Sequence, residues 1–254
     1  MNHQPIGVFD SGVGGVSVLR NLVRLLPHER FIYYGDNRNA PYGTRCEEDI
    51  RRLALHVTDE LLAFGIKGLL VACNTATSAA VELLRERLDI PVVGMEPALK
   101  PASAMRKDGR VLVLATPATL RQKKFAHLYA LYGEQTIVLP CPGLMDFAER
   151  DLLEGPEIDG YLSQLLSPLR GEKLDVAVLG CTHYSFLTKA LHKALPGVPL
   201  IDGNEGTARR LEYLLRENGT LCTQGKGSVE FMTSGEEDVF LPLMRRLFSI
   251  PIEE

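Results

Sequence analysis

Two cysteines occupy equivalent places in an internal repeat of the chain. Cys73 lies in "GLLVACNTATSAAVELL" and Cys181 in "DVAVLGCTHYSFLTKAL", and each segment runs from an apolar strand pattern through the cysteine into an amphipathic helical pattern. Pro91 and Pro199 then follow the two cysteines at the same spacing. In parallel α/β sheets, ligands bind beyond the carboxyl ends of the strands, where both cysteines fall. The repeat therefore favours two facing, functional thiols over the usual buried structural cysteine.

A pair of facing thiols suits proton transfer on both sides of one carbon. A thiolate can remove the proton from Cα while a thiol returns one to the opposite face, which inverts the configuration. A free thiol is only slightly ionised at neutral pH, so the thiolate needs stabilisation. Helix N-terminal amides can provide it, and His183, two positions after Cys181, is a candidate to assist that cysteine.

Other cysteine chemistries fit the sequence less well. A phosphatase loop needs arginine at the sixth position after the cysteine, where this chain has Ala79 and Leu187. Cys73, Cys181 and His183 lack the local spacing of a tetrahedral zinc site, so we predict no metal. A thiol hydrolase would use one cysteine with a base and leave the second, symmetry-related cysteine without a role.

The glycine-rich stretch "IGVFDSGVGG" near the N-terminus resembles a phosphate-binding loop, but it departs from both known patterns. Ser17 replaces the third glycine of the dinucleotide motif, and Val13 stands where a P-loop needs lysine. Asp10 would repel a phosphate, whereas it could accept a hydrogen bond from an amino-acid ammonium group or share a proton with Cys73. Ser11 and the loop amides offer donors. The alternative for Asp10 is a plain helix N-cap.

Composition limits the classes of protein that the chain can belong to. It has 254 residues, 45% of them hydrophobic, and a formal net charge of -4. This charge gives no positive field for nucleic acid, and no apolar run is long enough to predict a membrane span. Five cysteines without CxxC pairs indicate reduced thiols. We therefore expect a cytoplasmic protein that binds neither nucleic acid nor membrane.

The pattern of the whole chain predicts an α/β fold. β-branched runs alternate with helical segments, which favours mainly parallel sheets. The repeat predicts two pseudo-symmetric lobes with the active site in the cleft between them. We place the first lobe at residues 1–95 plus 205–254 and the second at 96–204. Strands are predicted at 6–9, 31–34, 68–72, 92–94, 111–115, 136–139, 176–179, 200–201 and 229–232.

Two helices carry local predictions of their own. Ser234 and Glu237 form a capping-box pattern before an apolar segment near the C-terminus. Pro242, inside that segment, is expected to kink the helix or displace its start. In the helix after Cys73, Leu83 is placed on the shared apolar face.

Six motifs, taken in order, resemble the glutamate racemase family. They are "FDSGVGG", "GDNRNAPYG", "VACNTA", "TPAT", "ERDLLEG" and "LGCTHY". Members of this family racemise L-glutamate to D-glutamate without a cofactor and supply D-glutamate for bacterial peptidoglycan. The resemblance thus implies an isomerase that needs no pyridoxal phosphate, metal or nucleotide, and it implies a homodimer.

The resemblance also implies roles for particular residues. Cys73 and Cys181 would be the catalytic acid/base pair, with Asp10 supporting the first and His183 the second. Glu149 would lie near the second cysteine. The substrate-binding residues would be Asp10, Ser11, Tyr42, Gly43, Asn74, Thr75, Thr116, Thr182 and His183.

Two alternatives remain open at this point. The chain could racemise aspartate or another amino acid, although "DSG" and "PYG" favour glutamate. It could also be a nonenzymatic two-lobed module that binds an amino acid, which would leave the cysteines without a purpose. Because the chain begins almost at its first strand, it lacks the N-terminal extension of members activated by a cell-wall precursor, and we expect no such activation.

Overall fold

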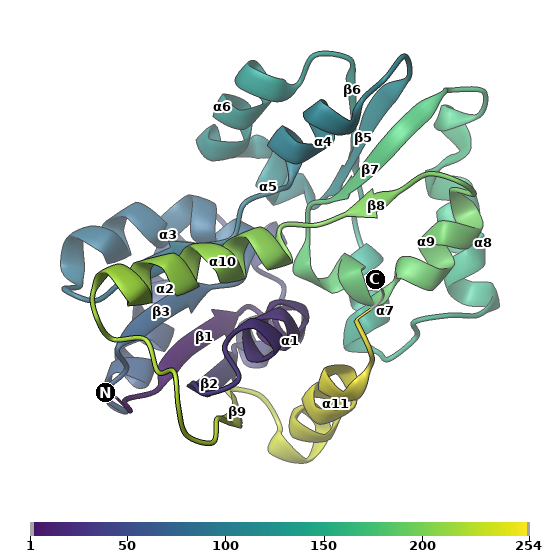
Figure 1. Cartoon of the computed structure of the whole chain (residues 1–254). Coiled ribbons are helices and arrows are strands. Elements are labelled where there is room, and N and C mark those ends of the chain that lie inside the picture. The colour runs from purple at the N-terminus through teal and green to yellow at the C-terminus, as the bar shows by residue number, and fades with distance from the viewer. Residues whose placement is uncertain (1–2, 253–254) are drawn as a thin grey trace.

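The computed structural model describes residues 3–252, which fold into an α/β structure with two parallel sheets (Figure 1). The first sheet has the strand order β4-β3-β1-β2-β9 and the second β6-β5-β7-β8, and every paired strand is parallel. All the predicted strands are confirmed, with small differences at their ends. Their bounds are β1 Ile6–Asp10, β2 Arg30–Gly35, β3 Gly68–Val71, β4 Val92–Gly94, β5 Arg110–Ala115, β6 Thr136–Pro140, β7 Leu174–Leu179, β8 Leu200–Ile201 and β9 Ser228–Thr233.

The two sheets share one topology, as the sequence repeat predicted. Starting from β2, the first sheet runs β2-β1-β3-β4, and the second runs β6-β5-β7-β8. When the strands of each half are numbered along the chain, both sheets therefore have the order 2-1-3-4. The C-terminal strand β9 extends the first sheet beyond β2. The lobe boundaries at 95/96 and 204/205 stay a prediction.

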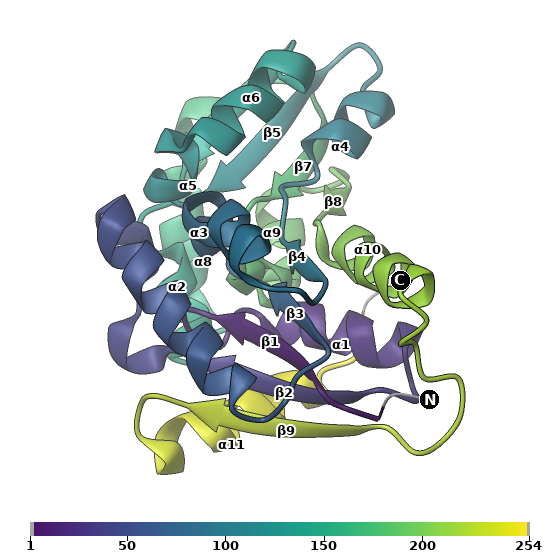
Figure 2. The same cartoon turned by 90° about the vertical axis from the view of Figure 1, so that its left-hand side faces the viewer.

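Helices cover both faces of each sheet (Figures 1 and 2). In the first sheet, α1 and α10 pack against one face and α2 and α3 against the other, which gives two separate apolar clusters. Burying one large aliphatic side chain in such a cluster stabilises the fold by about 1.5–3 kcal/mol. The helices are α1 Val16–Leu25, α2 Glu47–Leu62, α3 Asn74–Arg87, α4 Leu99–Met105, α5 Pro117–Arg121, α6 Lys123–Tyr132, α7 Leu144–Glu149, α8 Pro156–Leu165, α9 Thr188–Ala194, α10 Asn204–Glu217 and α11 Glu237–Ser249.

The carboxyl ends of the central strands β1, β3, β5 and β7 lead into the loops between the two sheets. Between the sheets the chain crosses after β4 and again after β8, and these crossings lie against each other. A Cβ placed on Gly203 would collide with the backbone carbonyl oxygen of Glu96. Glycine at position 203 therefore allows the close approach of the two crossings.

Two local predictions, the cap at Ser234 and the buried Leu83, were wrong, and the kink predicted at Pro242 stays a prediction. Helix α11 begins at Glu237 without a side-chain cap, and Ser234 instead donates to Asp36 Oδ1 at 2.6 Å, because β9 carries it to the end of β2. Pro242 lies inside α11, which continues to Ser249. Leu83 is 39% exposed, since the buried face of α3 passes through other positions.

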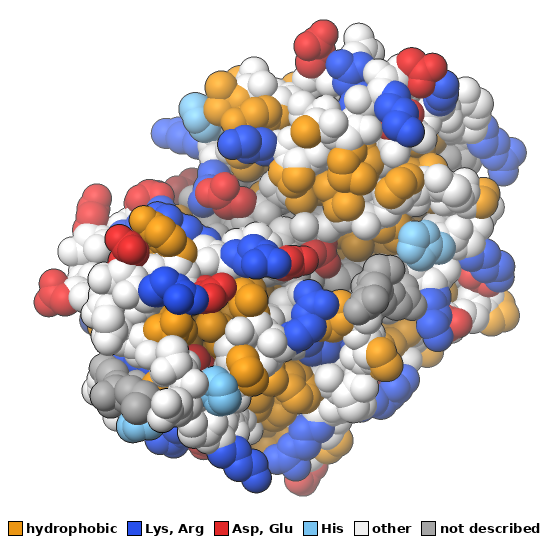
Figure 3. Space-filling model, viewed as in Figure 1, with side chains coloured by type: hydrophobic (Ala, Val, Ile, Leu, Met, Phe, Trp, Pro, Cys, Tyr) orange, Lys and Arg blue, Asp and Glu red, His pale blue; other side chains and the backbone are white. Residues whose placement is uncertain are grey.

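Two further features bear on the class of protein. None of the helices within residues 3–252 combines the length and the apolar character needed to cross a membrane. On the face shown in Figure 3, acidic and basic side chains are interspersed over most of the surface.

Candidate active site

Cys73 lies at the N-terminus of a helix. Strand β3 ends just before it, and Cys73 is the N-cap of α3, where its Sγ accepts a hydrogen bond from Ala76 N at 3.4 Å. The thiol also contacts Ser11 Oγ at 3.6 Å, and the residue is only 6% exposed. Cys181 follows β7 in the second lobe and is 9% exposed. The amphipathic helix predicted downstream of Cys181 is confirmed as α9, and the 3₁₀ turn Thr182–Phe186 separates it from the cysteine.

Beside Cys181, the structure places an imidazole and a carboxylate. His183 Nδ1 lies 3.6 Å from Cys181 Sγ, and His183 Nε2 lies 2.7 Å from Glu149 Oε1. Burial is the strongest influence on His183 and lowers its pKa, but hydrogen bonds to Cys181 and Glu149 together raise the pKa well above its ordinary value. Cys181 therefore has a protonated imidazole as its neighbour.

Cys73 has an acidic neighbour, whereas the neighbour of Cys181 is a protonated imidazole. Asp10 is fully buried, and its carboxylate accepts hydrogen bonds from Gly12 N at 3.2 Å and from Thr182 Oγ1 at 2.9 Å. Burial raises the pKa of Asp10. Burial, followed by the nearby Asp10 charge, raises the pKa of the Cys73 thiol to about 12. Cys73 is therefore a neutral thiol in this closed state, whereas Cys181 has a cationic neighbour.

A small cavity separates the two thiols and collects most of the predicted site residues. Its volume is about 10 Å³, which is room for roughly one water molecule. A bound amino acid would therefore require the walls of the cavity to move apart. The cavity is lined by Asp10, Ser11, Gly43, Cys73, Asn74, Thr75, Thr116, Thr119, Met145, Cys181, Thr182 and His183.

Tyr42 and Glu149, two of the predicted residues, do not line the cavity. The Tyr42 hydroxyl donates to Asp36 Oδ2 at 2.6 Å, and Tyr42 begins the 3₁₀ turn that carries Gly43. Glu149 lies behind His183 and bonds its imidazole, but it does not itself line the cavity. Tyr42 is therefore a supporting residue that bonds Asp36 and does not line the cavity itself.

Thr119 and Met145 also line the cavity, although neither was predicted as a site residue. The Thr119 hydroxyl lies 3.0 Å from Thr116 Oγ1 and 3.3 Å from Thr75 Oγ1. Thr119 could have been found from the sequence, because it follows Thr116 at the spacing of a helix cap at the start of α5. Met145 is an apolar residue in a helical segment, and nothing in its sequence context points to a site.

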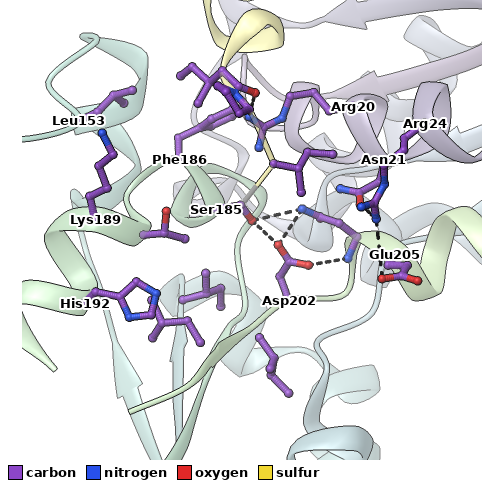
Figure 4. A pocket seen from close by; sticks show the side chains of 18 of the residues that line it. Arg20, Asn21, Arg24, Leu153, Ser185, Phe186, Lys189, His192, Asp202 and Glu205 are labelled. Carbon is purple, nitrogen blue, oxygen red and sulfur yellow. Dashed lines mark hydrogen bonds and ion pairs between the residues drawn. The ribbon is translucent and has the colours of Figure 1, made fainter. Parts of the chain in front are cut away.

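A second cavity, of about 1140 Å³, lies where α1 and α10 face α9, β8 and the turn after Cys181 (Figure 4). Its acidic and basic side chains largely neutralise one another. Arg24 lies 3.9 Å from Glu205, and Lys189 lies 3.0 Å from Glu154. Neither thiol lines this cavity, so the smaller cavity is the candidate active site. No group of three or more metal-ligating side chains occurs in the part of the chain that the structure describes.

The different surroundings of the thiols predict different reactivity. We expect iodoacetamide to alkylate Cys181 faster than Cys73 near pH 8, because only the thiolate reacts and the pKa of Cys73 is about 12. The rate at Cys73 should rise with pH, since deprotonation increases toward that pKa. Peptide mass spectrometry over a time course would measure both rates. Equal rates, or a faster Cys73, would contradict the assignment, and the exposed Cys46 provides a fast reference.

The structure has two α/β lobes of the same topology, and they enclose a pair of buried thiols. These features define a class of two-lobed proteins with a paired-cysteine site. A family model described as "Asp/Glu/Hydantoin racemase" matches residues 6–211. The chain therefore belongs to the Asp/Glu/hydantoin racemase family and is an isomerase. The resemblance inferred from the six sequence motifs is confirmed.

Individual relatives agree with this family over nearly the whole chain. A glutamate racemase from Clostridium botulinum is 45% identical over 254 residues, with 98% of this chain and 99% of that protein covered. The crystal structure of glutamate racemase isoform RacE1 from Bacillus anthracis matches with a TM-score of 0.89 and 33% identity, covering 100% of this chain and 97% of that one. Escherichia coli glutamate racemase in complex with L-glutamate and the activator UDP-MurNAc-Ala matches with a TM-score of 0.84 and 34% identity, covering 96% and 95%.

Proposed function

We propose that this protein interconverts L- and D-glutamate by proton transfer between Cα and the thiols of Cys73 and Cys181. The observation that carries the proposal is the opposed electrostatic setting of two buried thiols around one cavity. Stereoinversion requires one group to be ready to accept a proton while the other is ready to donate one. The relatives named as glutamate racemases support glutamate as the substrate.

In the proposed reaction, the Cys181 thiolate removes the Cα proton while the Cys73 thiol protonates the opposite face. His183 stays protonated beside Cys181 and stabilises its thiolate form before the transfer. After the transfer, Cys181 carries the substrate proton and Cys73 is a thiolate. In the reverse reaction, Cys73 is therefore the base and Cys181 the acid. Asp10, next to Cys73, destabilises that thiolate and favours its reprotonation.

Fixed polar groups around the cavity would bind the amino acid and stabilise the charge that develops on its carboxylate. The hydroxyls of Ser11, Thr75 and Thr182 and the loop amides are available as donors. Asn74 Oδ1 is buried and has no hydrogen-bond partner among the described residues, although Asn74 lines the cavity. We infer that this acceptor, together with Asp10, receives the substrate ammonium group, because an unpaired buried acceptor is otherwise unfavourable.

Substrate entry in this proposal requires the lobes to separate. The cavity volume of about 10 Å³ cannot hold glutamate. Hydrogen bonds from Thr182 Oγ1 to Asp10 and from Gln122 Nε2 to Thr75 O, at 3.2 Å, join the two halves across the cavity. Opening breaks these bonds, and closure around the substrate re-forms the site and excludes water.

The cellular role that we propose is the supply of D-glutamate for peptidoglycan, in the cytoplasm, by a homodimer without cofactor. This part of the proposal rests on the family resemblance of the sequence motifs.

The direct test is to incubate the purified protein with L-glutamate in D₂O without added cofactor. We expect optical rotation to fall as deuterium enters at Cα, because the proton that returns comes from an exchangeable thiol. Polarimetry and proton NMR on one sample would follow both changes, with L-aspartate as the parallel substrate. Turnover of aspartate alone would favour an aspartate racemase. Tight glutamate binding without exchange would favour the nonenzymatic binding module.

A further inference from the structure

The glycine loop after β1 holds a carboxylate from the other lobe. Val13 N donates to Glu149 Oε1 at 2.8 Å, and a Cβ on Gly12 would overlap that same carboxylate. A Cβ on Gly14 would in turn overlap the ring of His183. The loop therefore accommodates the Glu149–His183 pair in the place where a related loop would hold phosphate.

Asn37 makes a second contact between the first lobe and this carboxylate. It lies in the 3₁₀ turn Asn37–Asn39 after β2, is buried, and donates from Nδ2 to Glu149 Oε2 at 3.2 Å. Asn37 lines neither cavity and has no contact with a thiol. Among the described residues, the hydrogen bond to Glu149 is what connects the Asn37 side chain to the candidate active site.

The C-terminal strand fixes the orientation of the Asn37 amide. Gly235 N donates to Thr233 Oγ1 at 3.0 Å, so the Thr233 hydroxyl proton is directed to Asn37 Oδ1 at 2.9 Å. With its oxygen accepting from Thr233, the amide presents its NH₂ group to Glu149. Strand β9 thereby determines which atom of Asn37 faces the carboxylate.

The donors to Glu149 come from both sides of the cleft. Val13 and Asn37 belong to the first lobe, whereas His183 follows β7 of the second sheet, as does the rest of the Cys181 side. When the lobes separate, Glu149 loses the first two of these donors and keeps His183. In the closed state, the two donors fix the carboxylate and share its negative charge.

We propose that Asn37 is a positioning residue that couples lobe closure to the proton transfer at Cys181. By holding Glu149, it fixes His183 against Cys181 only when the lobes are closed. The inference rests on the proposed racemisation for its consequence in catalysis, but the Asn37–Glu149–Val13 contact itself can be tested without substrate.

The test compares Asn37→Asp with Arg38→Ala, which changes an exposed side chain in the same turn. Asn37→Asp keeps the shape of the side chain but places a carboxylate against Glu149, and we expect kcat to fall about tenfold with little change in KM. In an E149Q background the repulsion is absent, so N37D should lower kcat by less than about twofold. Arg38→Ala should behave like the unmodified protein.

A second pair of variants keeps the test decisive if Asn37→Asp folds poorly. Thr233→Val removes the hydroxyl that orients Asn37, and we expect kcat to fall about threefold. Thr233→Ser keeps the hydroxyl and should restore the original kcat. A loss of equal size in both Thr233 variants would indicate a packing effect and overturn the inference.

Amide exchange at Val13, measured by NMR without substrate, separates this inference from the proposed function. Exchange should be faster in N37D and T233V than in the unmodified protein, R38A and T233S, because Val13 N–H loses a fixed acceptor. If the unmodified protein does not racemise glutamate but Val13 responds as expected, the proposed function fails and the contact stands. If it racemises while N37D keeps the original kcat and Val13 exchange, the inference fails.

Discussion

Cys73→Ala and Cys181→Ala should each reduce racemisation of glutamate by about 10³-fold or more while the protein stays folded. With one thiol removed, the other can still take a proton from the face that it borders, but it can return one only to that same face. Each variant should therefore exchange the Cα proton of one enantiomer for deuterium without inverting it. Because the thiols border opposite faces, the two variants should exchange opposite enantiomers.

Proton NMR of separate L- and D-glutamate samples in D₂O measures this exchange, and polarimetry measures inversion. Cys46→Ala is the matched control, since Cys46 is an exposed cysteine outside the cavity and its loss should leave both rates unchanged. Racemisation by either single variant, or exchange of the same enantiomer by both, would contradict the two-thiol mechanism.

Gly12→Ala should lower kcat/KM about 100-fold, although it adds a single methyl group. The new Cβ would overlap Glu149 Oε1, so the carboxylate or the whole loop must shift when the lobes close. His183 then loses its fixed partner, and a displacement of about 1 Å at a reacting group can reduce the rate by that factor. Steady-state kinetics in both directions, together with thermal melting, would measure the effect.

Gly160→Ala provides the control for adding a methyl group to a glycine. Gly160 lies exposed in α8 with open space around the position of a Cβ, and alanine is the better helix former. We expect unchanged kinetics and a slight gain in stability. The steric argument fails if Gly12→Ala retains the original kcat/KM, or if its activity falls only in proportion to the loss of folded protein.

The strand framework was predictable because parallel strands covered on both faces must be apolar throughout. Segments such as 68–72 and 176–179 show this signal locally, and the repeat places a cysteine after each of them. The shared topology of the two sheets follows from the same repeat. Local signals failed where a tertiary partner replaced the local one, as at Ser234, which bonds Asp36 instead of capping its own helix.

Some site residues could likewise be predicted from local sequence signals, and others depended on tertiary contacts. The cysteines, Asp10 and the polar pairs after each strand could be predicted, since the end of a strand fixes where its loop begins. The direction of the Tyr42 ring toward Asp36, and the participation of Thr119 and Met145, depend on how side chains from separate elements meet. No spacing within one element encodes such contacts.

By itself, the sequence determined the α/β alternation, the repeated half-chain, the place of each thiol at the end of a strand and the family resemblance. Only the tertiary structure decided that Asp10 meets Thr182, that Glu149 is held by Val13 and Asn37, and that Cys73 is the neutral thiol. The physical reason is that charge and hydrogen bonding at the site depend on burial and on the relative placement of the two lobes. Both are set by the sum of many packing contacts between residues remote in the chain.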